Sequence, residues 1–276
     1  MPERFQNVFL TQWEELLRLR RAVLKTSDLD DIHDLRVSSR RFRAVLGLLG
    51  NLSPPESAAK LKKRAGKLTR VLGGLRNIDE ALLCFRPRVP ADSSAAHHLF
   101  TILAEMRTAE LRRIDKALAE FDPGRFHRVV RELASGLRTG FTPDGNSRSL
   151  PAFFSDVSIT LFQPINNLRA VSSAPEQRES RHALRIAIKK LRYFLEIVAQ
   201  VLNCDYGQEL GLLKEYQSIL GRMNDVVEFG ILCRDLELPP SERQFVETVL
   251  AAEDELLLSR FMELVGQKPL VYTFRM

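Results

Sequence analysis

The sequence predicts an all-α protein made of two helical bundles that are related by internal duplication. Apolar residues recur at spacings of three and four along most of the chain, with almost no alternation of period two, which is typical of amphipathic helices. Clusters of proline and glycine divide the chain into segments of helical length. A stretch that contains His33 also recurs around His182, so we expect two related halves.

The boundaries of the expected helices follow from the proline and glycine clusters. Pro54-Pro55, Pro123-Gly124 and Pro239-Pro240 each separate two amphipathic segments. Ser53 and Ser149 stand just ahead of proline, where a serine oxygen can accept a hydrogen bond from the first helical turn. In chain order, the expected helices are Gln6–Lys25, Asp31–Gly50, Ser57–Leu83, Ala95–Phe121, Pro123–Leu137, Pro151–Ser172, Glu176–Asn203, Gln208–Cys233 and Pro240–Leu264.

The two halves are expected to meet at a polar linker. A length of 276 residues suits two domains of roughly 150 residues each. Thr139–Ser149 is rich in Gly, Pro, Asn, Asp and Ser and contains one large apolar residue, Phe141, which is typical of linkers. We therefore expect an N-terminal half at residues 1–140 and a C-terminal half at residues 141–276.

The internal repeat is visible in two places. Ile32–Leu46 aligns without gaps to Arg181–Leu195 at an offset of 149 residues, and five of the fifteen pairs are identical. Leu72-Gly73 and Leu220-Gly221 form a second match at an offset of 148. Two matches at nearly the same offset indicate homologous halves rather than coincidence.

Each repeat carries a cationic stripe on one helix. At about 100° per residue, Leu35, Phe42 and Leu46 form an apolar face, and basic residues lie beside it. The first cationic stripe consists of His33, Arg36, Arg40 and Arg43, and the second consists of His182, Arg185, Lys189 and Arg192. Each stripe covers roughly 15 Å of helix, so it suits an extended ligand. Arg41 and Lys190 belong to the same segments but point to the other flank.

The helix that follows the first stripe adds further cations. These are Lys60, Lys63, Arg64, Lys67 and Arg70, which recur at spacings of three and four beside a leucine face. The equivalent segment of the second half offers Lys214, Gln217 and Arg222, so the basic surface should be asymmetric. Four glycines interrupt these helices, and we expect close helix contact or a local bend at Gly66, Gly73, Gly74 and Gly221.

Composition narrows the class of protein. The chain has 41 Lys and Arg against 35 Asp and Glu, which gives a net charge of +6. Its start does not resemble a signal peptide, and no run of about 18 apolar residues could span a bilayer. We therefore expect a cytoplasmic protein that does not bind a membrane. The three cysteines are odd in number and widely separated, so we expect buried free thiols.

Three other interpretations compete with an anion-binding role. A cationic stripe can be a solvated helix face that pairs with acids elsewhere, but solvation does not require the same four positions to recur in both halves. A single-stranded nucleic-acid binder would share the charge, yet it would need aromatic stacking platforms, and only Tyr193 lies near a cationic flank. Apart from these interpretations, the histidines His33 and His182 lack partners at metal-ligand spacing, so we expect no metal and no cofactor.

The third interpretation is an enzyme that processes phosphate compounds. Such an enzyme would need metal-binding carboxylates, an activated nucleophile or a glycine-rich phosphate loop. Asp79, Asn224 and Asp225 are the available groups near the stripes, and we expect the two aspartates to pair with neighbouring arginines instead. The sequence therefore predicts a binding protein without catalytic residues.

Taken together, these segments resemble the conserved histidine α-helical domain family, known as CHAD. The hallmark segments are His33–Val37 with Arg40–Arg43, and His182–Ile186 with Lys189–Tyr193. Leu72–Asp79 and Leu220–Asp225 resemble the Leu-Gly motifs that follow them, except that Asn77 stands where an aspartate is expected. The resemblance covers nearly the whole chain from Phe5 onward.

The resemblance implies both an architecture and a ligand. It implies two bundles related by a pseudo-twofold axis, whose basic helices face a shared groove or pore that binds inorganic polyphosphate. It also implies association with polyphosphate granules, and phosphate or sulfate could occupy the same site. The implied contacts are His33, Arg36, Arg40, Arg41, Arg43, His182, Arg185, Lys189, Lys190 and Arg192; Lys63, Arg64, Lys67, Arg70 and Lys214 rest on the stripe pattern alone.

Overall fold

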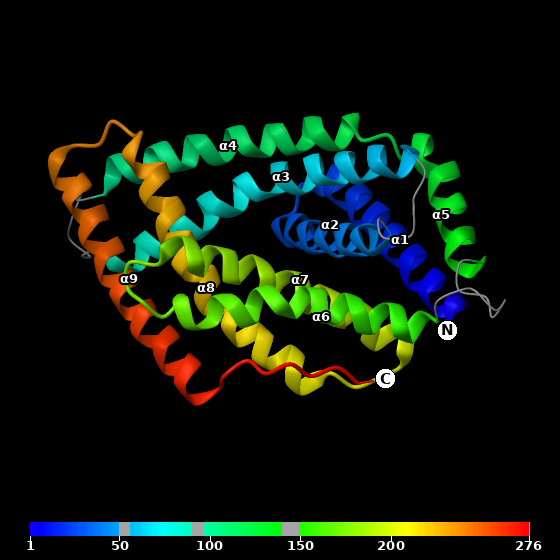
Figure 1. Cartoon of the computed structure of the whole chain (residues 1–276). Helices are drawn as coiled ribbons and strands as arrows, with labels where there is room; N and C mark the ends of the chain where they lie inside the picture. Colours follow the sequence, from blue (N-terminus) through cyan, green and yellow to red (C-terminus); the bar gives the residue numbers. More distant parts are fainter. Residues whose placement is uncertain (50–55, 90–95, 140–148, 276) are drawn as a thin grey trace.

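The computed structural model describes residues 1–49, 56–89, 96–139 and 149–275, and in these ranges the chain is helical without a β-strand (Figure 1). The α-helices are α1 (Pro2–Thr26), α2 (Leu29–Leu49), α3 (Glu56–Phe85), α4 (His97–Glu120), α5 (His127–Thr139), α6 (Leu150–Val171), α7 (Arg178–Leu202), α8 (Gly207–Arg234) and α9 (Pro240–Gln267). Two short 3-10 segments lie at Arg86–Arg88 and Pro123–Phe126. The predicted all-α class is confirmed.

The predicted helices are present with bounds that differ by a few residues, and the fifth differs most. Pro123–Phe126 forms a 3-10 turn, and α5 begins only at His127, because the Asp122 carboxylate accepts a hydrogen bond from the Gly124 amide and holds a tight turn there (2.9 Å). The predicted cap of α6 is confirmed, since Ser149 Oγ accepts a hydrogen bond from the Ala152 amide (3.3 Å). Ser53 and most of the expected linker, residues 140–148, lie outside the described residues.

The helices pack as two consecutive series. In the first, α1, α2, α3 and α4 each contact the next helix, and in the second α6, α7, α8 and α9 do the same. The series meet where α1 and α2 contact α7 and where α3 contacts α8. The starts of α2 and α7 are 149 residues apart, as are the ends of α3 and α8. The helix bounds thus follow the offset of the sequence repeat, while the duplication itself stays a prediction.

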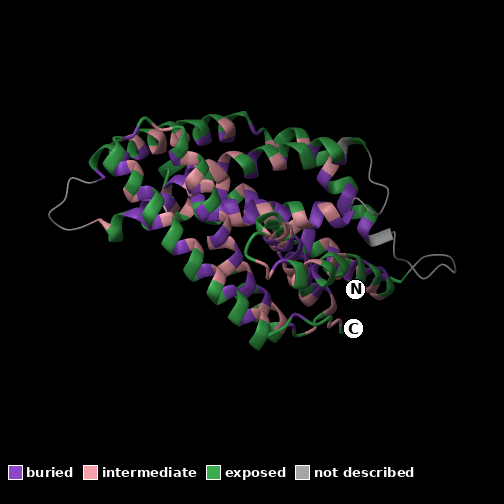
Figure 2. Ribbon diagram, turned by 60° about the vertical axis from the view of Figure 1, so that its left-hand side comes forward, coloured by how far each residue is buried: buried purple, intermediate pink, exposed green. Residues whose placement is uncertain are grey.

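Buried residues alternate with exposed ones along the helices (Figure 2). Both hydrophobic clusters that they form contain residues from each half of the chain. In the larger cluster, Phe154 of α6 packs against Phe5 of α1 and Phe194 of α7, with ring centroids 5.5 and 5.9 Å apart. In the smaller cluster, Phe85 and Phe229 lie 6.1 Å apart at the ends of α3 and α8. The interface between the series is therefore apolar core, which fixes α2 against α7.

The leucine face expected on α3 is buried, and the glycines of this helix differ from one another. A Cβ added to Gly74 would overlap the carboxylate of Glu110 on α4, so close helix contact is confirmed there. A Cβ at Gly73 or Gly221 would meet nothing within 4 Å, and one at Gly66 would lie 3.8 Å from Arg43. Close contact is therefore excluded at Gly73 and Gly221, and the other alternative, a local bend at these glycines, stays a prediction.

Two further observations concern the described residues only. None of their helices is long and apolar enough to cross a membrane. The thiols Cys84, Cys204 and Cys233 are free; the first and third are buried and Cys204 is half-buried.

Candidate functional site

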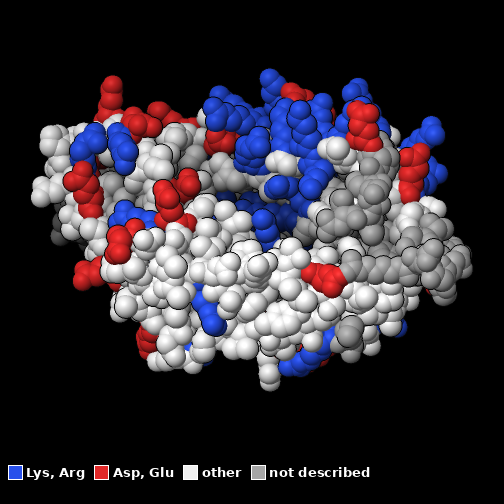
Figure 3. Space-filling view, viewed as in Figure 1, with Lys and Arg blue, Asp and Glu red and all other residues white. Residues whose placement is uncertain are grey.

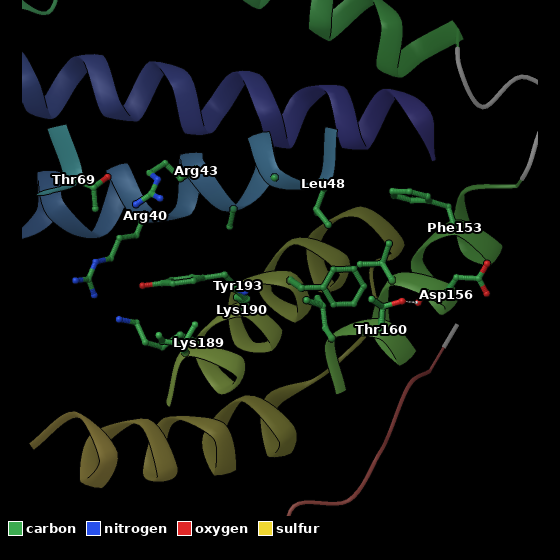
Figure 4. Close-up of a pocket in the computed structure, with 16 residues that line it drawn as sticks. Arg40, Arg43, Leu48, Thr69, Phe153, Asp156, Thr160, Lys189, Lys190 and Tyr193 are labelled. Carbon is green, nitrogen blue, oxygen red and sulfur yellow. Dashed lines mark hydrogen bonds between the residues drawn. The ribbon is translucent and has the colours of Figure 1, made fainter. Parts of the chain in front are cut away.

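A cavity of about 810 Å³ lies where α2, α3, α6 and α7 meet (Figure 4). Arg40 and Arg43 of α2 line it together with Lys189 and Lys190 of α7. The first and second cationic stripes therefore contribute to one cavity. This arrangement follows from the contact between α2 and α7, because each helix buries its apolar face in the core and leaves its basic flank toward the other.

Lys189 shows how closely the two stripes approach each other. Burial lowers the pKa of Lys189 from 10.5 to about 7, and the positive charges of nearby arginines add to the shift. Those arginines are Arg40, Arg185, Arg36 and Arg76, in decreasing order of effect. Burial also lowers the pKa of Arg185, on which Arg40 and Arg76 act as well. Cations from α2, α3 and α7 thus form one repulsive cluster in the free protein.

Arg36 lies deeper than the sequence pattern indicated. Its helical-wheel position is beside the apolar face, but α2 packs between neighbouring helices and only 9% of the residue remains exposed. Burial, followed by the charges of Arg40 and Arg76, lowers the pKa of Arg36 to about 10. Its Nε atom is buried with no hydrogen-bond partner among the described residues. The guanidinium therefore has an unused donor beside the cation cluster.

Arg76 and Asp225 lie beneath this cluster and join the two series of helices. The Arg76 guanidinium donates two hydrogen bonds to the Asp225 carboxylate, at 2.5 and 2.7 Å, and Asp225 is only 1% exposed. Glu80 lies 3.5 Å from Arg76 and 3.6 Å from Arg222. Asp225, the acid whose charge acts most strongly on Arg185, is thus already paired.

The sequence reasoning anticipated these acid pairs in part. Asp79 accepts a hydrogen bond from Arg107 (2.7 Å), and Asp225 pairs with Arg76, so both aspartates pair with arginines as predicted. Arg76 itself was not among the predicted site residues. No spacing within α3 or α8 indicated this pair, because Arg76 and Asp225 are 149 residues apart in the sequence and meet only where the two helices pack.

Three of the predicted polyphosphate-binding residues donate hydrogen bonds to acidic or amide side chains outside the cluster. Arg41 donates to Glu196 (3.3 Å), and Lys67 donates to Glu120 (3.2 Å). Arg192 donates to Gln217 (2.8 Å) and Glu196 (2.6 Å), and its guanidinium carbon lies 4.6 Å from the Tyr193 ring centroid. These side chains fit the solvated-face interpretation better than the cavity residues do.

The remaining predicted residues lie at the surface and do not line the large cavity. His33, Lys63, Arg64, Arg70 and Lys214 are exposed, and the charge of Arg70 lowers the pKa of Arg43 after burial and Arg40. Lysine and arginine side chains gather over the region of α2 and α3 and extend into the hollow between α3 and α7 (Figure 3). The cavity thus opens onto a basic surface.

His182 lies outside the cation cluster. Its Nδ1 lies 2.6 Å from Asn224 Oδ1, and it lines a second cavity of about 220 Å³ at the start of α7. The structure therefore does not bring His33 and His182 into the large cavity. Within the described ranges, no group of three His, Cys, Asp or Glu side chains is placed to hold a metal ion.

Comparison with known proteins assigns the chain to a family. The family model of the CHAD domain matches residues 7–234, so the chain belongs to the CHAD domain family. No curated protein sequence matches the chain.

Two solved structures share the fold. The CHAD domain from the plant Ricinus communis is 26% identical, with a TM-score of 0.67 over 98% of this chain and 88% of that one. PptA from Streptomyces chartreusis is 18% identical, with a TM-score of 0.72 over 97% of this chain and 99% of that one. The helical fold described above is therefore the fold of this family.

Proposed function

We propose that this protein binds inorganic polyphosphate at the large cavity and does not act on it chemically. The observation that supports this most directly is the convergence of Arg36 and Arg40 of α2 with Arg185 and Lys189 of α7, where burial and mutual repulsion depress the pKa of Lys189 to about 7. Such a cluster is unfavourable when empty. A ligand with closely spaced negative charges would relieve the repulsion.

Polyphosphate has the charge density that this cluster needs. Each phosphate unit carries about one charge, and arginine and lysine donors replace its counterions through charge-assisted hydrogen bonds. The cationic groups of Arg40 and Lys189, which line the cavity, are available to phosphate oxygens. From the cavity, a longer chain could follow Arg43 and Arg70 to the exposed cations of α3, Lys63 and Arg64.

The direct test is binding of long-chain polyphosphate to a double variant. Arg40→Gln with Lys189→Gln removes one charge from each cationic stripe and should weaken binding at least tenfold at low salt. The matched control is Arg112→Gln with Lys116→Gln, which removes two exposed charges from α4, a helix that does not line the cavity. Equal affinity of the two double variants would contradict the proposal.

Salt and competition separate polyphosphate from nucleic acid. If phosphate contacts supply the affinity, log K should fall linearly as log salt rises. Single-stranded RNA at equal phosphate concentration should compete poorly, because Tyr193 is the aromatic residue that lies among the cations and it is 9% exposed. RNA that competes on equal terms would favour the nucleic-acid alternative.

Two parts of the proposal need separate experiments: that the protein does not cleave or extend polyphosphate, and where it lies in the cell. Incubation with Mg²⁺ or Mn²⁺ should leave the polyphosphate chain length unchanged on a gel, and shortening would favour a metal-dependent enzyme. On this proposal the protein associates with polyphosphate granules in the cytoplasm. A fluorescent fusion should then colocalise with the granules, and the cavity double variant should not.

A further inference from the structure

The large cavity has two chemically different ends (Figure 4). At one end lie the cationic groups of Arg40 and Lys189, and at the other lie Leu48 and Phe153, with Tyr193 between them. Apolar side chains of α2, α6 and α7 make up much of the lining, namely Leu48, Phe153, Val157, Leu161, Ile186 and Phe194, and Lys190 lines the cavity as well. The cavity is therefore amphipathic along its length.

Polyphosphate accounts for only one of these ends. It has no apolar surface, so it would not cover the part of the apolar lining that remains accessible. Ile186 is 39% exposed in the free protein, whereas Leu48, Phe153, Val157 and Phe194 are each 9% exposed or less. Sites for small organic ligands have volumes of about 300 to 1,000 Å³ and combine an apolar lining with a few polar groups. The cavity volume of about 810 Å³ lies within this range.

We propose that the cavity binds a phosphate monoester with a linear hydrocarbon tail. The phosphate would lie between Arg40 and Lys189, where charge complementarity is strongest, and the tail would run along α6 past Val157 and Phe153. Asp156 lines the opposite end of the cavity from these two cations (Figure 4). Because Arg40 and Lys189 lie at one end of the cavity, the ligand has one favoured orientation.

The tail is a hydrocarbon rather than a nucleobase because the apolar end offers few hydrogen-bonding partners. Its residues belong to helices, whose backbone groups bond to each other. The Thr160 hydroxyl already donates to the carbonyl of Asp156 (2.9 Å). A base would therefore bury polar edge atoms without partners, which is costly, whereas a hydrocarbon loses nothing.

Isothermal titration with hexyl, octyl and decyl phosphate, each below its micelle concentration, tests this directly. Affinity should rise about two- to fourfold for each added methylene, in line with hydrocarbon burial. Inorganic phosphate, decanol and AMP should each bind at least tenfold more weakly than decyl phosphate. An affinity that does not depend on chain length, or AMP that binds as tightly as decyl phosphate, would overturn the proposal.

A cavity-filling variant locates the tail. Gly47 lines the cavity, and a Cβ there would meet nothing within 4 Å, so Gly47→Leu should fold and project into the apolar space. It should weaken decyl phosphate binding at least tenfold and polyphosphate binding much less, because position 47 lies about two helical turns beyond Arg40 on α2. The matched control is Gly211→Leu on α8, where a Cβ also meets nothing within 4 Å, and it should change neither affinity.

A second variant tests the same point if Gly47→Leu does not fold. Ile186→Ser removes an exposed apolar side chain from the cavity and should weaken decyl phosphate binding three- to tenfold. If a folded Gly47→Leu or Ile186→Ser protein keeps the wild-type affinity, the tail does not occupy this end and the proposal fails. The result is independent of polyphosphate: a protein that binds decyl phosphate but not polyphosphate would contradict only the proposed function.

Discussion

Replacing Lys189 by methionine should remove a pH dependence from the stability of the free protein. The pKa of this ammonium is lowered from 10.5 to about 7 in the folded protein. Between these values the unfolded chain holds a proton that the folded protein has lost, so the free energy of unfolding should rise with pH across that window. Lys189→Met has no proton to lose at this position and should lack this contribution.

The size of the effect follows from the same shift. At ~1.36 kcal/mol per pKa unit, charging Lys189 in the folded state costs about 5 kcal/mol well below pH 7. At pH 8.5 the remaining cost is about 3 kcal/mol, because the folded protein then holds Lys189 neutral while the unfolded chain is still charged. From pH 6 to pH 8.5 the wild type should therefore gain about 2 kcal/mol that Lys189→Met does not gain.

Urea unfolding followed by circular dichroism at pH 6 and pH 8.5, in buffers free of phosphate and sulfate, measures this difference. Lys116→Met is the matched control, because Lys116 is an exposed lysine on α4, and it should keep the wild-type pH dependence. The histidines are the same in all three proteins, so the comparison isolates the substituted lysine. If Lys189→Met and Lys116→Met show the same pH dependence, Lys189 does not lie in a repulsive cluster and the account of the cavity is wrong.

Three further predictions follow from the same contacts. Polyphosphate should return a proton to Lys189, so calorimetry at pH 8 in buffers of different ionisation enthalpy should show uptake of up to about one proton per complex; no uptake would place the ligand away from Lys189. Asp225→Asn should leave Arg76 without its buried partner and lower the free energy of unfolding by about 3 kcal/mol, yet it should not weaken polyphosphate binding, because the acid opposes the ligand. In thermal melts, Gly73→Ala should stabilise α3 by up to about 1 kcal/mol, whereas Gly74→Ala should gain less, because the carboxylate end of Glu110 on α4 must move aside; a larger gain at Gly74 would contradict the helix contact.

The sequence by itself determined the helices, their order and the position of the basic flank on α2 and α7. These features depend on local spacing, because an apolar residue every three or four positions selects one face of a helix whatever it packs against. The cap at Ser149 is local in the same way, since the hydroxyl contacts an amide only three residues ahead. The turn at Asp122 is also local, but proline and glycine there were interpreted as the start of a helix.

Only the tertiary structure decided which cations act together. Arg36 is buried, and the pKa of Lys189 is lowered to about 7, because α2 packs on α7. This packing joins residues about 150 positions apart in the sequence. The same packing pairs Arg76 with Asp225 and leaves His182 outside the large cavity. The apolar end of the cavity likewise depends on α6, whose Phe153 and Val157 have no special spacing relative to the cationic stripes. Burial and charge repulsion depend on neighbours in space, and the periodicity of a single helix carries no information about them.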